Sequence, residues 1–385
     1  MKKKALRAAG LALAVVLMAL PMASAKYVVA DTLQAPEVTV VYSRKWTAAD
    51  GSFAVVAGEN DGYYAINLWG ACGGYGTAAG GATDVWGQAV NVPSRYGRGG
   101  RVRAIVQLGA GTYYLCAGVK AGNGSDNSNG TPGGGYGYGG VSHFGGGGGG
   151  YSHLSAGNAT PTTGVSSNLV ALAGGGGGGA GHPGWPFLNN YTNGGSGGLV
   201  TATGETKGGN SGSQGNVNIG PITDPANYHG LVFGAGGGWL HYGHTGTPVL
   251  NGGGRVTWDT GTVTYNTPGT PLQGGSWVVA ANAPAAGGGG GGYNGGGAGG
   301  CCTDSTSYPG AVFVSGGGGG SSYLPAAYRV GTTFSAMLTT NTGLGTFLDG
   351  AFTDYTSAAS RYDGVCEVIY LGPNPPDTSD WLGNY

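Results

Sequence analysis

Four long runs of glycine, separated by stretches of other residues, constrain this chain more than any other feature of its sequence. The runs are Gly145–Gly150, Gly174–Gly179, Gly287–Gly292 and Gly316–Gly320. The first two start 29 residues apart, as do the last two, and the second pair follows the first at an offset of 142 residues. Linkers drift in length, so this matched spacing indicates a repeated structural unit.

The overall composition indicates that the glycine-rich chain is ordered. Glycine and proline supply 90 and 18 of the 385 residues, a level that is typical of low-complexity sequence. Hydrophobic residues, however, make up 40% of the chain and charged residues only 9%. Disordered segments show the opposite balance, because they lack the apolar surface that would offset the entropy of ordering.

Strand patterns occur between the glycine runs. We expect strands within Lys26–Trp46, Ala65–Gly74 and Gly364–Gly372, and two strands within Arg101–Gly122. At the start of that last stretch, apolar residues alternate with two arginines and a glutamine, and a Gly-Ala-Gly break follows. No stretch after residue 25 shows a sustained period of 3.6 residues, so the predicted fold class is all-β with almost no α-helix.

The glycine runs have a physical role in such a fold. A polyproline II helix has three residues per turn and leaves its backbone N–H and C=O groups without internal partners. Glycine helices of this kind have no Cβ atoms, so they can lie in contact and satisfy one another laterally. Each glycine costs about 0.5–1 kcal/mol relative to alanine in regular structure, so an isolated run would not order. We therefore predict a bundle of polyglycine II helices, which the apolar stretches Leu169–Ala173 and Ala311–Ser315 hold to the β-structure.

The order of strands and runs resembles the glycine-rich domain of the anaplastic lymphoma kinase and leukocyte tyrosine kinase ectodomains, and of bacterial and phage glycine-rich adhesins. The stretches that carry the resemblance are Ala65–Gly74, Gly109–Gly122, Leu169–Gly179, Ala311–Leu324 and Gly364–Leu371. The resemblance implies a jelly-roll-like β-sandwich with an inserted polyglycine II helix bundle. This sequence contains no kinase region and no transmembrane segment, so receptor signalling is not implied.

The N-terminal 25 residues have the pattern of a secretory signal peptide. Four basic residues lie among the first seven, Leu11–Leu20 is too short an apolar stretch to span a bilayer, and Ala23-Ser24-Ala25 fits a cleavage site. The alternative is an N-terminal anchor helix. We expect a secreted or surface-displayed protein with a strand extension over 26–52, one glycine-rich domain over 53–372 and a C-terminal tail over 373–385.

Charge and motif content exclude several classes of function. The signal segment holds four of the 16 basic residues and none of the 17 acidic ones, so the remaining chain has a net charge of −5. Nucleic acid binding requires clustered Lys and Arg, which are missing. The acidic residues are scattered, and His241 and His244 have no acidic or Cys partner close in sequence. We therefore expect no enzyme, no metal, no cofactor and no membrane span.

The cysteines are disulfide candidates, because exported proteins encounter oxidising conditions. They are Cys72, Cys116, Cys301, Cys302 and Cys366. Their odd number leaves at least one outside any intrachain pair. A bond between the adjacent Cys301 and Cys302 would be strained, and separate partners are the alternative.

Aromatic residues gather in two connectors between glycine runs, His182–Asn193 and Gly238–Gly246. The candidate ligand-binding residues in them are Trp185, Phe187, Tyr191, Trp239, His241 and Tyr242. Aromatic side chains on rigidly held loops suit recognition, because they offer a large contact area at little conformational cost. The alternative is that these rings cap the ends of the glycine bundle.

Two functions fit these features. The first is an adhesin or binding module whose loops contact a surface glycan or protein. The second is a structural subunit of an extracellular filament or matrix, in which Lys26–Trp46 adds as a strand to the next subunit. In the second case the protein would self-associate.

Overall fold

The computed structural model describes residues 40–44, 51–76, 96–124, 129–130, 139, 142–143, 145–164, 166–180, 197, 205–206, 269–276, 287–299, 301–304, 311–314, 316–336, 344–346, 350–352 and 363–377. These residues form antiparallel sheets, and the only helix among them is a single turn of 3₁₀ helix, η3 (Ala326–Tyr328). The all-β prediction is confirmed at this level. The predicted signal segment, Met1–Ala25, lies outside the described residues.

Two large sheets contain most of the strands. The first has the order β1 (Val40–Arg44), β17 (Val365–Gly372), β3 (Gly62–Trp69), β4 (Gly100–Leu108) and β14 (Arg329–Ala336). The second has the order β10 (Glu205–Thr206), β13 (Ser322–Tyr323), β9 (Leu169–Ala173), β8 (Ser152–Ala156), β5 (Gly111–Cys116) and β2 (Gly51–Val55). Three two-stranded ladders join β11 (Cys301–Asp304) to β12 (Ala311–Val314), β15 (Leu344–Thr346) to β16 (Gly350–Phe352), and β6 (Asn129–Gly130) to β7 (Ser142–His143).

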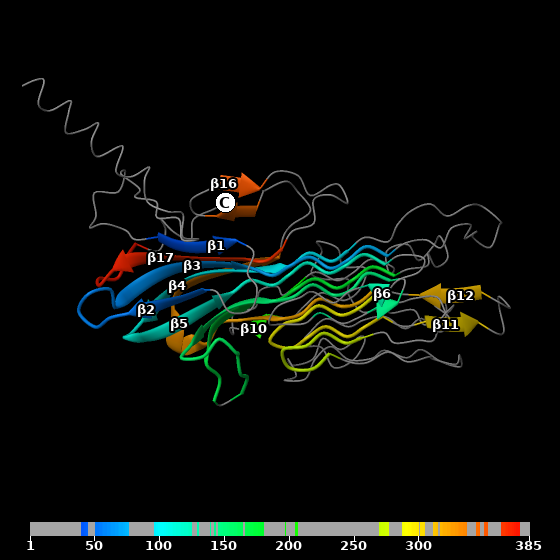
Figure 1. The fold of residues 1–385 in the computed structure, drawn as a ribbon, viewed down its shortest axis with the longest axis horizontal. Coiled ribbons are helices and arrows are strands. Elements are labelled where there is room, and N and C mark those ends of the chain that lie inside the picture. Colours follow the sequence, from blue (N-terminus) through cyan, green and yellow to red (C-terminus); the bar gives the residue numbers. More distant parts are fainter. Residues whose placement is uncertain are drawn as a thin grey trace, which may run out of the picture.

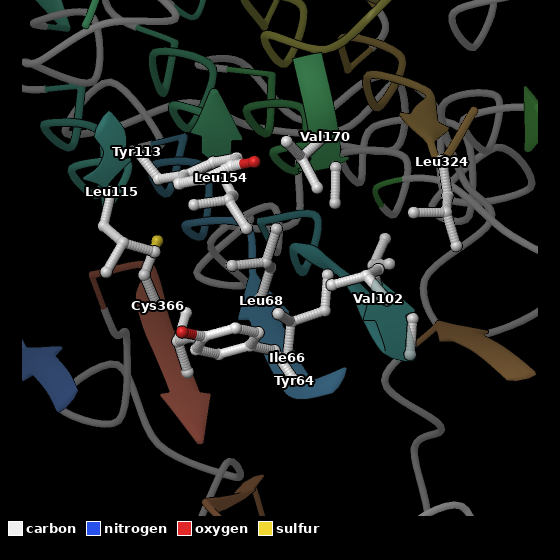
Figure 2. Close-up of a cluster of buried hydrophobic side chains, with 14 of the residues drawn as sticks. Tyr64, Ile66, Leu68, Val102, Tyr113, Leu115, Leu154, Val170, Leu324 and Cys366 are labelled. Atoms are coloured by element: carbon white, nitrogen blue, oxygen red, sulfur yellow. The ribbon is translucent and has the colours of Figure 1, made fainter. Parts of the chain in front are cut away.

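One hydrophobic core lies between the two large sheets. Ile66, Leu68 and Val102 from the five-stranded sheet meet Leu115 and Leu154 from the six-stranded sheet, as Figure 2 shows. All five side chains are at most 1% exposed. Burying a side chain of this size contributes about 1.5–3 kcal/mol, so this shared core holds the two sheets together.

Most predicted strands are confirmed, with shifted boundaries. Arg101–Gly122 contains β4 and β5, and Gly364–Gly372 contains β17. The strand expected in Ala65–Gly74 is β3, which ends at Trp69. Gly70 N still donates to Gly100 O at the start of β4, and from Ala71 to Gly74 the backbone bonds to other glycine segments. Within Lys26–Trp46 the structure describes β1, which pairs with β17 of the same chain.

Beyond the sheets, eight glycine-rich segments run side by side between the sheets and the far end of the molecule, where β6, β11 and β12 lie (Figure 1). We call them the glycine lattice: residues 70–76, 96–100, 118–124, 145–150, 174–179, 287–292, 294–299 and 316–321. Several of them continue strands of the core, since 70–76 follows β3, 96–100 leads into β4 and 174–179 follows β9. The apolar strands therefore anchor the glycine segments at the sheet end, as the sequence predicted for Leu169–Ala173. The other predicted anchor, Ala311–Ser315, differs: its residues 311–314 form β12, which pairs with β11 and belongs to neither large sheet.

Candidate functional site

The glycine lattice is buried backbone with almost no side chains. Most of its residues, including all of Gly145–Gly150 and Gly174–Gly179, are buried. Buried N–H and C=O groups require partners, and here they find them on neighbouring glycine segments. These lateral hydrogen bonds let a chain without side chains form a second packed region beside the hydrophobic core.

The hydrogen bonds of the central segment, 174–179, repeat every third residue. Any three successive residues of the segment bond to three different neighbouring segments, and the fourth residue returns to the first of these. The bonds run from Gly175 N to Gly291 O (2.7 Å), Gly178 N to Gly288 O (2.7 Å), Gly176 N to Ala71 O (3.0 Å), Gly179 N to Gly74 O (3.0 Å), Gly100 N to Gly174 O (2.7 Å) and Gly97 N to Gly177 O (2.7 Å). A chain with three residues per turn presents its backbone groups in this way.

No side chain can enter the centre of the glycine lattice. A Cβ atom on Gly176 would overlap the carbonyl group of Gly97, and one on Gly289 would overlap that of Gly296. In both cases the obstacle is backbone, which cannot swing aside as a flexible side chain can. Glycine is therefore required at these positions by the close approach of neighbouring chains.

The repeat found in the sequence has a direct structural counterpart. Gly145–Gly150 and Gly287–Gly292 are separated by the 142-residue offset, and they lie next to each other in parallel. Gly288 N donates to Gly146 O (3.0 Å) and Gly291 N to Gly149 O (2.9 Å), so equivalent positions of the two units bond to each other. The matched spacing thus places two copies of the same glycine segment in register.

Tyrosines close the sheet end of these two segments. Tyr151 and Tyr293, which follow the two runs, are 2% and 6% exposed and pack with Leu169 and Leu172. The ring of Tyr293 stacks on that of Tyr323, with centroids 4.0 Å apart and an interplanar angle of 18°. At this end of the lattice, aromatic residues act as caps.

The aromatic connectors predicted as ligand-binding loops lie outside the described residues. Trp185, Phe187 and Tyr191 belong to 181–196, and Trp239, His241 and Tyr242 belong to 207–268. The structure does describe where the first connector begins and ends. Gly179 N donates to Gly74 O (3.0 Å) just before it, and Gly197 N donates to Arg98 O (2.6 Å) just after it. Both ends of this connector are fixed to the glycine lattice.

A buried polar cluster lies on the face of the five-stranded sheet opposite the hydrophobic core. Asn67 on β3 links two charged residues: its Nδ2 donates to Glu367 Oε2 (3.1 Å), and its Oδ1 accepts from Arg101 Nε (2.9 Å). The Arg101 guanidinium also lies over the ring of Trp69, 4.4 Å from its centroid. Glu367 is fully buried, while Arg101 and Arg103 are 9% and 6% exposed. Burial lowers the pKa of Arg101 to about 10, with Arg103 lowering it further and Glu367 opposing the shift.

Sequence reasoning missed this cluster. The alternation in β4 suggested one apolar and one polar face, and a polar strand face is usually solvated. Here Ala65, Ile105 and Ile369 on the same face as the arginines are also buried, so both faces of the sheet are covered. The acidic partner, Glu367, is 300 residues away from Asn67 along the chain. The one available signal was a lone glutamate inside the apolar strand β17.

His153 on β8 is a second buried titratable group. Its side chain is fully buried, and its Nε2 lies 3.1 Å from the carbonyl oxygen of Ala159. Because a carbonyl only accepts, Nε2 carries the proton of the neutral ring. Burial lowers the pKa of His153 to about 4, and the bond to Ala159 opposes this shift. His153 is therefore neutral at pH 7 and ties the loop after β8 to the strand.

We expect acid to destabilise the fold through His153. The unfolded chain binds this proton near pH 6.5, whereas the folded chain binds it only near pH 4. Between these values the unfolded state holds more protons, so the free energy of unfolding falls as the pH falls, by about 3 kcal/mol in total. Urea unfolding at pH 7 and pH 4 should show this loss, and His153→Gln, which keeps an N–H donor but does not titrate, should remove it. An equal loss in wild type and variant would contradict the assignment.

The described cysteines are not joined to one another. Cys72, Cys116 and Cys366 are all buried, and no disulfide links them. Cys366 lies in the core and its Sγ donates to the carbonyl oxygen of Cys116 (3.2 Å). Leu115 and Ala117 belong to the same core, so Cys116 between them lies on the other face of its strand. For Cys301 and Cys302 only the backbone pairing, opposite Val314 and Phe313, is described.

The described residues contain no group of three or more His, Cys, Asp or Glu that could hold a metal ion. Within the same part of the chain, no helix is long and apolar enough to cross a membrane. Models of known protein families give no match to the sequence, and neither do curated proteins.

Proposed function

We propose that this chain is a non-catalytic binding protein, secreted or displayed at a cell surface, in which a rigid glycine lattice presents aromatic loops to a glycan or protein ligand. The observation that carries the proposal is the anchoring of connector 181–196 at both ends, through Gly179 and Gly197. A loop with fixed ends loses less conformational entropy when it binds, so more of its contact energy appears as affinity.

We further propose that the lattice is a bundle of polyglycine II helices inserted in a jelly-roll-like sandwich. The three-residue period of hydrogen bonds in 174–179 supports this assignment, because polyproline II geometry has three residues per turn. The positions of Gly176 and Gly289, where a Cβ atom would overlap backbone, support it as well. The core shared by the two large sheets supports the sandwich.

The connector residues suit recognition in this setting. Trp185, Phe187, Trp239 and Tyr242 are large rings in a chain of which only 10% is aromatic. Aromatic residues are enriched at binding surfaces, where they supply large, stiff contact area. The capping alternative remains the competing role for them, because Tyr151 and Tyr293 act in that way at the sheet end.

A filament built by exchange of Lys26–Trp46 is the less favoured alternative. Five residues of this segment, in β1, pair in register with β17 of the same chain. A strand used inside its own sheet is not available to the next subunit. Electron microscopy of the purified protein separates the two functions: discrete particles support the binding protein, and polymers support the filament.

Alanine at Trp185, Phe187, Trp239 and Tyr242 together is expected to abolish binding to glycan arrays and to intact cells without lowering the melting temperature. The reason is that recognition side chains contribute to the ligand contact and not to the core. Tyr293→Ala is the matched control, since this ring is buried beside the lattice and its loss should lower stability instead. Retained binding together with a lower melting temperature in the fourfold variant would identify the connector rings as caps.

A further inference from the structure

Three of the four edge strands of the large sheets carry features that discourage pairing with another chain. β1 contains Arg44, β14 contains Arg329 and a register irregularity between Arg329 and Gly331, and β10 is two residues long and contains Glu205. Charge, bulges and short length are the usual protections of sheet edges. β2 (Gly51–Val55) has none of these, since it is uncharged, five residues long and in continuous register with β5.

The backbone of β2 leaves part of its hydrogen-bonding capacity facing away from β5. The carbonyl oxygen of Thr112 on β5 accepts from the N–H of Gly157, which follows β8. The backbone N–H and C=O groups of Thr112 therefore point away from β2. Backbone N–H and C=O groups point to alternate sides from one residue to the next along an antiparallel strand. Those of Tyr113 therefore point toward β2, where Tyr113 lies opposite Phe53. It follows that Ser52 and Ala54 direct their N–H and C=O groups to the outer side, and both residues are exposed. Among the described strands, none pairs with β2 on that side.

The carboxamide of Asn60 occupies this outer side in the way a neighbouring strand would. Its Nδ2 donates to the carbonyl oxygen of Ala54 (3.1 Å), and its Oδ1 accepts from the N–H of Val56 (2.6 Å). The side-chain amide thus supplies one donor and one acceptor to the outer edge of β2. Val56, the residue after β2, is 44% exposed. It is one of two exposed large hydrophobic side chains among the described residues.

We propose that the outer edge of β2 is a strand-pairing site for a second copy of this chain, and that Asn60 blocks it. Around a two-fold axis at Phe53, Ser52 of one copy lies opposite Ala54 of the other, and their outward N–H and C=O groups bond in both directions. This pairing requires the carbonyl oxygen of Ala54, which Asn60 holds in the single chain. Two uncharged β2 strands meet without like-charge repulsion, whereas the sequences of β1, β14 and β10 contain Arg44, Arg329 and Glu205.

Sedimentation velocity of the full chain over a range of concentrations tests this proposal. We expect wild type to remain a monomer, and Asn60→Ala and Asn60→Ser to double in mass as the concentration rises. In the paired state the amides of Ser52 and Ala54 should exchange with solvent more slowly than in wild type. Asn60→Ser retains a turn-forming residue and so guards against a variant that fails to fold.

Two further variants make the result specific. Asn60→Ala combined with Ala54→Lys should stay monomeric, because the exposed Ala54 position would bring two positive charges together. Asn168→Ala, which removes another half-buried carboxamide that bonds to backbone of its own loop, should also stay monomeric. Folded but monomeric Asn60 variants would overturn the proposal. So would equal association of Asn168→Ala, or a wild-type dimer that pairs through β2.

Discussion

Replacing Gly176 with valine is expected to unfold the glycine lattice. The new Cβ would overlap the carbonyl group of Gly97, and the backbone of the adjacent Arg98 is also within its reach. To make room, the segment would have to give up the bonds of Gly176 N to Ala71 O and of Gly149 N to Gly176 O. Overpacking a core costs up to about 3 kcal/mol, and the lost buried hydrogen bonds add to that cost. We expect a loss of at least about 3 kcal/mol in the free energy of unfolding.

Gly109→Val is the matched control for this substitution. Gly109 lies in the turn between β4 and β5, is exposed, and a Cβ atom there meets no atom within 4 Å. Its replacement should change stability by about 0.5 kcal/mol or less. Amide exchange gives a second measurement, since the amides of Gly176 and Gly149 should be protected in wild type nearly as well as strand amides. Similar stability of the two variants, or immediate exchange throughout 174–179, would contradict a close-packed lattice.

Glu367→Gln is expected to destabilise the five-stranded sheet by about 3–5 kcal/mol, the usual effect of removing one partner from a buried charge cluster. The substitution keeps the shape of the side chain and an oxygen for Asn67 Nδ2, so it removes little besides the negative charge. Arg101 and Arg103 would then be buried without this carboxylate. Denaturant unfolding at pH 7 measures the loss.

Two comparisons separate this charge effect from other causes. Glu59→Gln makes the same chemical change at an exposed turn and should have almost no effect. Arg101→Met should be less destabilising in the Glu367→Gln background than in wild type, because the two charges stabilise each other across Asn67. Additive effects of the two changes would show that the residues act independently.

The strands and the order of the glycine runs could be predicted because their signals are local. The alternation in β4 and the apolar stretch of β9 are short-range patterns, and the spacing of the runs can be read directly along the sequence. Even the 142-residue offset had a structural meaning, since it places Gly146 beside Gly288. Boundaries were less accurate: β3 ends at Trp69, and the residues from Ala71 to Gly74 bond to glycine segments from elsewhere in the chain.

The buried polar cluster and the edge of β2 could not be predicted in the same way. Glu367 and Arg101 lie on strands far apart in sequence, and only strand order places them on either side of Asn67. The burial of Arg101 depends on coverage of the second face of the sheet, which alternation within one strand does not reveal. Among the cysteine candidates, Cys72, Cys116 and Cys366 are buried, and no disulfide links these three to one another.

The sequence by itself determined that this protein is all-β and that its glycine runs belong to one repeated arrangement, because periodicity and spacing can be read along the chain without knowing which segments meet in space. The tertiary structure decided which segments bond to which, that β1 completes its own sheet, and that Asn60 closes the edge of β2. Glycine carries no side chain to specify a partner. The position of each glycine segment is therefore set by the strands that anchor it and by the backbone groups of its neighbours.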